Sequence, residues 1–286
     1  MKLRLLGAGT SSGVPRIGND WGKCDPNEPK NRRRRCSLLV ERSSDAGTTR
    51  ALIDTGPDLV PQLTDAGVGL LDAVVWTHPH ADHLHGIDDL RQIVHNRRSI
   101  LPGWADRPTA AALHKRFGYA FETPPGSSYP PILELHLIGG PFTVPGKGGP
   151  IHFTPFTVDH GIPALGFRIC EEEGGRALVY LPDVLAIPDT AWPAIMDAEV
   201  FICDALRRTP HPSHARRSSG RCQRRVVRSS SQVPHLTRSP SHRRGRGRES
   251  PPTMTRRAGL RECRRIPAII SVILGTRTSQ ARERPT

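Results

Sequence analysis

The distribution of aromatic and charged residues restricts a folded core to the first part of this 286-residue chain. Every Phe, Trp and Tyr lies before Ala215. Residues 215–286 instead hold nineteen Arg, no Lys, ten Ser and only three Glu, a net charge of +16. Such a segment offers too little apolar surface to offset the entropy lost on folding. We therefore predict one domain over residues 1–214 and a disordered tail, rich in Arg, Ser and Pro, over residues 215–286.

The excess of basic charge also belongs to the tail. The whole chain carries +14, so a tail of +16 leaves −2 for residues 1–214. The domain itself is therefore slightly acidic, and its composition gives no reason to predict nucleic-acid binding.

We expect neither a secretory signal nor a membrane helix. The opening apolar stretch reaches Gly7 too soon for a signal core, and the run from Ile266 to Leu274 is shorter than the ~20 residues that span a bilayer. The six cysteines are not closely paired. These features are typical of a cytoplasmic protein with reduced thiols.

Short apolar runs bounded by Gly, Pro or Asp predict a layered α/β fold. We expect a strand over Leu3–Leu6, a hairpin of Ser37–Glu41 and Ala51–Asp54, a buried strand over Leu70–Trp76 and a helix near Asp88–Val94. Later strands are expected at Leu133–Ile138, Ile151–Val158, Leu165–Glu171, Ala177–Leu181 and Val200–Asp204. The glycines from Gly7 to Gly13 fit neither a P-loop nor a dinucleotide fingerprint, which favours a structural turn.

A dense group of metal-binding side chains follows the predicted buried strand. His78, His80, Asp82 and His83 lie within six residues. Imidazole nitrogens and carboxylates are the ligands with which proteins hold divalent metals for hydrolysis. Three His and one Asp in this spacing arise rarely by chance, so the motif predicts a metal site at the edge of a sheet.

The motif resembles the H-x-H-x-D-H signature of the metallo-β-lactamase superfamily. Other stretches are similar to the PhnP-type phosphodiesterases of that superfamily, which are related to RNase Z: residues 6–15 (LGAGTSSGVP), 31–35 (NRRRR) and 85–91 (HGIDDLR). The resemblance covers residues 1–214 and implies an αββα sandwich with two metals at one sheet edge.

The resemblance also implies a role for each matching residue. His78, His80 and His160 would bind one metal, Asp82 and His83 would bind the second, and Asp183 would bridge the two. Asp54 would orient the metal loop without binding metal. Asp82 or His214 would assist proton transfer. For His160 and His214, a solvent-exposed loop histidine is the alternative interpretation.

The implied activity is phosphodiester hydrolysis by a hydroxide that bridges two Zn²⁺ or Mn²⁺ ions. Imidazole and carboxylate ligands suit both metals, so the sequence does not choose between them. A small phosphodiester or nucleotide-like substrate is expected, and a homodimer remains open. Cys24 and Cys36 are too few for the four-ligand structural zinc of some relatives, so we predict none.

The sequence departs from the family after His214. The family continues with a helix, a strand ending in a histidine motif that completes the second metal site, and a closing strand; the Arg-rich tail shows none of these. We therefore expect a fold lacking its last helix and strands. Our hypothesis is a frameshift after His214, which would leave a poorly active or inactive copy. The alternative is an RNase Z-like protein whose tail is a basic arm that binds nucleic acid.

Overall fold

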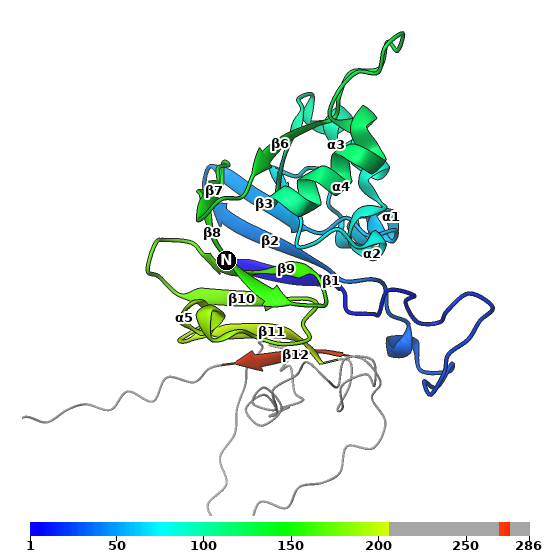
Figure 1. Ribbon diagram of the computed structural model, residues 1–286, viewed down its shortest axis with the longest axis vertical. Helices are drawn as coiled ribbons and strands as arrows, with labels where there is room; N and C mark the ends of the chain where they lie inside the picture. The colour runs from blue at the N-terminus through cyan, green and yellow to red at the C-terminus, as the bar shows by residue number, and fades with distance from the viewer. Residues whose placement is uncertain (206–268, 275–286) are drawn as a thin grey trace, which may run out of the picture.

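The computed structural model describes residues 1–205 and 269–274, which form two facing β-sheets with helices on their outer sides (Figure 1). The first sheet has the order β1-β2-β3-β4-β5-β6. Its strands are β1 (Lys2–Gly7), β2 (Ser37–Ser44), β3 (Gly47–Ile53), β4 (Ala73–Val75), β5 (Leu101–Ala105) and β6 (Leu133–Leu137).

The second sheet has the order β12-β11-β10-β9-β8-β7. Its strands are β7 (Phe142–Val144), β8 (Ile151–Asp159), β9 (Pro163–Cys170), β10 (Ala177–Leu181), β11 (Val200–Ala205) and β12 (Ile269–Leu274). The helices are α1 (Leu59–Ala66), α2 (Ala81–Leu84), α3 (Leu90–Arg97), α4 (Arg107–Phe117) and α5 (Trp192–Ile195), and short 3₁₀ turns lie at Pro29–Asn31, Ile87–Asp89, Gly118–Ala120 and Asp189–Ala191.

Successive apolar side chains of the strands point to opposite faces of each sheet, and this alternation produces three apolar layers. On β2 and β3, Leu39 and Leu52 face α1, α3 and α4, whereas Leu38 and Ile53 face the second sheet. On β10, Tyr180 faces the first sheet, whereas Val179 and Leu181 pack toward α5. Successive strand residues point to opposite faces, so strands covered on both faces are apolar throughout. The predicted αββα layering is confirmed, with α1 to α4 on one side and α5 on the other (Figure 1).

Local signals set several element boundaries. The Asp106 carboxylate accepts a hydrogen bond from Thr109 N at 3.0 Å and caps α4. Helix α1 ends at Gly67, which adopts φ 66° and donates its backbone N–H to the last turn. The β2–β3 hairpin turns over residues 45 and 46 alone, far shorter than the predicted Arg42–Arg50 loop, because the polar residues Arg42 to Ser44 pair with Gly47 to Thr49.

The predicted tail requires one correction. Ile269–Leu274, placed by the sequence in a disordered segment, forms β12 and pairs antiparallel with all of β11, from Val200 opposite Leu274 to Ala205 opposite Ile269. The rest of the tail, and with it the predicted loss of the last helix, lies outside the described residues. In the part of the chain that the structure describes, no helix combines the length and apolar character needed to cross a membrane.

Candidate metal centre

The candidate site lies where several strands end at the same edge of the sandwich. Strands β3 and β4 run parallel, so Asp54 and the loop after Val75 emerge together. In the second sheet, β8 ends beside His160 and β10 ends just before Asp183. Leu165 N donates a hydrogen bond to Thr77 O at 2.9 Å and links the loop to β9 of the second sheet. The fold thus converges residues that are distant in sequence.

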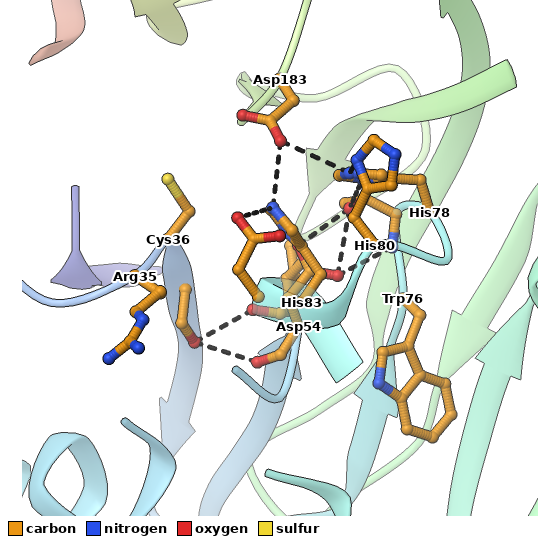
Figure 2. Close-up of polar contacts among 12 residues, drawn as sticks. Arg35, Cys36, Asp54, Trp76, His78, His80, His83 and Asp183 are labelled. Carbon is orange, nitrogen blue, oxygen red and sulfur yellow. Dashed lines mark hydrogen bonds and ion pairs between the residues drawn. The ribbon is translucent and has the colours of Figure 1, made fainter. Parts of the chain in front are cut away.

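Two groups of side chains offer ligand atoms within 4.8 Å of one another. The first metal group is His78, His80, His160 and Asp183, and the second metal group is Asp82, His83 and Asp183. Asp183 belongs to both: its Oδ2 lies 3.4 Å from His78 Nε2 and 3.0 Å from His83 Nε2 (Figure 2). The same oxygen lies 3.6 Å from His160 Nε2. The six residues that the sequence nominated as ligands therefore lie together.

A chain of hydrogen bonds fixes His78. The Thr77 hydroxyl lies 2.8 Å from Asp54 Oδ2, to which it donates, and 2.9 Å from His78 Nδ1. Because that hydroxyl proton points to the carboxylate, Nδ1 of His78 carries the proton and donates to Thr77 Oγ1. The lone pair of Nε2 is then directed at the site. Burial, the largest cause, lowers the pKa of His78 to about 2, so the imidazole is neutral, as metal binding requires.

Asp54 also orients His83, through a direct contact with the imidazole ring. His83 Nδ1 lies 2.7 Å from Asp54 Oδ2, and both side chains are buried. Its Nε2 is a buried atom that makes no hydrogen bond, although the carboxylates of Asp183 and Asp82 lie 3.0 and 3.4 Å away. A buried polar atom without a hydrogen-bond partner is costly. An imidazole nitrogen surrounded by carboxylates fits a divalent cation, which would satisfy it.

The position of Asp54 depends on an unusual backbone conformation. Its φ is 64°, in the left-handed region that non-glycine residues rarely adopt. Thr77 N also donates to Asp54 Oδ1 at 2.9 Å, so hydrogen bonds from two directions hold the carboxylate. Burial raises the pKa of Asp54, and the charge and hydrogen bond of His83 oppose this shift. Strained backbone held by such bonds is typical of functional sites.

Close backbone packing holds α2, which carries the second metal group, against the end of β3. A Cβ atom on Gly56 would lie 2.3 Å from Asp82 O, and one on Gly86 would lie 2.2 Å from Gly56 O. Thr55 N donates to His83 O at 2.8 Å, and Gly86 N donates to Thr55 O at 2.8 Å. Glycine is therefore required at both positions, and the helix cannot move without disturbing β3.

The carboxylates of the site are ionised. Burial raises the pKa of Asp183, but the close contact and charge of His83 outweigh this effect and bring the pKa to about 2. The same contacts with His83 lower the pKa of Asp82 against the effect of burial. Burial is also the main cause that lowers the pKa of His160. Anionic carboxylates beside imidazole nitrogens form a suitable donor set for Zn²⁺ or Mn²⁺.

One predicted site residue cannot be placed, and one supporting residue was missed by sequence reasoning. His214 lies outside the described residues. Thr77, whose hydroxyl joins Asp54 to His78, was not assigned a role. The only sequence signal for it is its position directly before the first histidine of the motif, at the end of a buried strand.

Comparison with known proteins identifies relatives of this chain. The family model described as "Beta-lactamase superfamily domain" matches residues 49–228. Among solved structures, a diphosphatase from the PhnP family is 34% identical, with a TM-score of 0.60 over 73% of this chain and 75% of that chain.

Two curated proteins are also similar. An octanoyltransferase of Porphyromonas gingivalis is 34% identical over 75% of this chain, and a ribonuclease Z of Myxococcus xanthus is 31% identical over 65%. The chain covers only 41% and 54% of the length of these two relatives. The names of these relatives therefore describe longer proteins, and a large part of each has no equivalent in the region matched by this chain.

Proposed function

Because the chain belongs to the β-lactamase superfamily, we propose that it is a metal-dependent phosphodiesterase. The observation that carries the proposal is the shared carboxylate of Asp183, which belongs to two groups of imidazoles and carboxylates. A carboxylate in that position can bridge two ions. The similar PhnP-family diphosphatase makes esters of phosphate or diphosphate the first substrates to test.

The proposed ligands are those named from the sequence. His78, His80 and His160 would hold one divalent ion, Asp82 and His83 would hold the second, and Asp183 would contribute to both sites. When bound, two such ions would lower the pKa of a water molecule and offset the negative charge that develops on the phosphate. Zn²⁺ and Mn²⁺ both suit these ligands.

The chain's own residues orient the site and handle protons. Asp54 and Thr77 fix the ring orientation of His83 and His78, so that their Nε2 atoms face the site. Asp82, half-buried with Oδ2 3.4 Å from His83 Nε2, is the proposed proton acceptor within the described residues. His214 is kept as the proposed donor to the leaving group.

The proposal is tested with the full-length protein loaded with Mn²⁺ or Zn²⁺ and with bis(4-nitrophenyl) phosphate as substrate. We expect metal-dependent hydrolysis that a His80→Ala variant loses at unchanged folding, as judged by circular dichroism. His95→Ala is the matched control, since His95 is an exposed histidine of α3 outside both metal groups. Undiminished hydrolysis by His80→Ala would contradict the proposal.

A second candidate is an RNase Z-like activity on RNA, supported by the 31% identity to the Myxococcus xanthus ribonuclease Z. Residues 215–286 would then act as a basic arm through phosphate neutralisation. Cleavage of a tRNA precursor, and salt-sensitive RNA binding that is lost when the arginines of residues 215–268 are replaced by glutamine, would favour this candidate. Resequencing the gene would decide whether a frameshift after His214 explains the tail instead.

A further inference from the structure

A pocket opens directly beside the first metal group. It has a volume of about 500 Å³ and is lined by Pro79, His80, Ala81, His85, Arg116 and Phe117. That size lies within the range of small-molecule sites. Because His80 belongs to both the pocket and the first metal group, a phosphate held at that group would direct one of its substituents into this space.

The lining combines an apolar surface with hydrogen-bond donors. Pro79, Ala81 and the half-buried ring of Phe117 form the apolar part. Arg116 and His85 add nitrogen atoms, and none of the lining residues is acidic. A guanidinium group carries five N–H donors and no acceptor, and the contact of Arg116 Nη1 with Pro79 O at 2.6 Å uses one of them. The lining therefore favours a ligand that offers acceptor atoms.

The two walls of the pocket are fixed relative to each other. The rings of His85 and Phe117 meet edge to face, with centroids 5.4 Å apart and an interplanar angle of 82°. Just beyond Phe117, the Tyr119 hydroxyl donates to the Asp88 carboxylate, whose two oxygens both lie 2.7 Å away. This bond ties the segment after α4 to the segment after α2. A preformed pocket loses little ordering entropy when a rigid ring enters it.

We propose that this pocket receives a planar aromatic ring with acceptor atoms, such as a nucleobase, attached to the phosphate held at the metal centre. Phe117 provides the apolar surface against which the ring packs. Arg116 donates to acceptor atoms on its edge, as arginine does to N7 and O6 of guanine. The proposal rests on the proposed function for the position of the phosphate, and it makes Arg116 and Phe117 specificity-determining residues.

Equilibrium binding separates this pocket from the hydrolytic chemistry. Calorimetry with the Mn²⁺-loaded full-length protein compares guanosine 5′-monophosphate with ribose 5-phosphate, which lacks the base. We expect about tenfold tighter binding of the nucleotide, a difference of about 1.4 kcal/mol. Equal binding of the two compounds would overturn the proposal.

Two variants locate the preference. Phe117→Leu keeps apolar volume but removes the flat ring, and Arg116→Gln keeps a donor for Pro79 O but removes the charge. Each is expected to reduce the nucleotide preference to about threefold or less. Lys115→Gln is the matched control, because Lys115 is an exposed cation of the same helix outside the pocket, and it should retain the full preference.

A preference retained in both variants would also overturn the proposal. Failure of the pocket proposal is distinguishable from failure of the proposed phosphodiesterase function, because the binding comparison requires no turnover. A protein that prefers the nucleotide but does not hydrolyse bis(4-nitrophenyl) phosphate supports the pocket and contradicts the phosphodiesterase assignment. Hydrolysis without any nucleotide preference supports the phosphodiesterase assignment and contradicts the pocket proposal.

Discussion

The two metal groups share Asp183 but are built differently. In the first group, three histidines come from two distant places in the chain; His80 is exposed and His160 is half-buried. In the second group, Asp82 and His83 are adjacent residues of α2, and His83 is buried against Asp54. The first group therefore has more ligands, whereas the second depends on fewer ligands that are more firmly held.

Rigid support of a few ligands can offset a smaller ligand set. Within the described residues, the second metal group has one fewer ligand than the first. However, Gly56 and Gly86 pack α2 against the end of β3, and Asp54 orients the ring of His83. Groups that orient a metal ligand are typically worth about 10- to 100-fold in metal affinity.

The largest effect is expected where the two groups meet. Asp183→Asn keeps the shape of the side chain but removes the charge that both groups use. We expect a loss of hydrolysis on the order of 10³-fold or more, together with reduced binding of both ions, because the variant weakens two sites at once. Activity assays and metal analysis of the purified protein measure the two losses.

Asp189→Asn is the matched control for this experiment, since Asp189 is exposed and belongs to neither group. It should leave both readouts unchanged. Retention of both ions by Asp183→Asn would show that the carboxylate does not join the two groups.

A smaller and unequal effect is expected at Asp54. Asp54→Asn weakens the hydrogen bond to His83 Nδ1, so the second ion should bind about 10- to 100-fold more weakly. The first group contacts Asp54 only through Thr77, and its affinity should fall less. Stepwise metal titration by calorimetry separates the two sites. Equal losses at both sites would contradict the view that Asp54 supports mainly the second group.

The smallest expected effect is a difference in proton release. Burial alone would lower the pKa of His83, but the charge of Asp54 and the contacts with Asp183, Asp54 and Asp82 raise it well above 6.5. In the metal-free protein His83 therefore carries a proton at neutral pH, and an ion that enters the second group must displace it. His78 has a pKa of about 2 and has no proton to release there.

The two metal groups should respond differently to pH. We expect His83 to release about one proton when the second ion binds at pH 7 and His78 to release none when the first ion binds, as measured by calorimetry in buffers of different ionisation enthalpy. The affinity for the second ion should fall as pH is lowered below the pKa of His83, whereas the affinity of His78 for the first should change little. Identical proton release at the two sites would be inconsistent with this difference.

Most of the strands could be predicted from the sequence, because apolar runs bounded by turn residues leave few alternatives. The runs at Ala177–Leu181 and Ile151–Val158 correspond closely to β10 and β8. Helix α4 and strand β5 were missed, since Arg107–Phe117 is only weakly amphipathic and Leu101–Ala105 contains Pro and Gly. The support for these elements comes from burial against the rest of the layer.

The chemistry of the site was determined by the sequence itself. His78, His80, Asp82 and His83 are ligand types in one short segment, and their spacing after a buried strand directs them to one sheet edge. The resemblance to a family added His160 and Asp183, and the structure brings all six together. Which ring nitrogens carry protons, and which of them face the site, depends on tertiary contacts that the sequence pattern does not reveal.

The orientation of these side chains depends on packing between segments that are distant in the chain. The orientation of His78 depends on Thr77 and Asp54, which are 23 residues apart in the chain but in contact across parallel strands. The pocket beside His80 likewise depends on α4 lying against the loop after β4. Residue type fixes which ligands are available, whereas hydrogen bonds between distant segments fix where their lone pairs point.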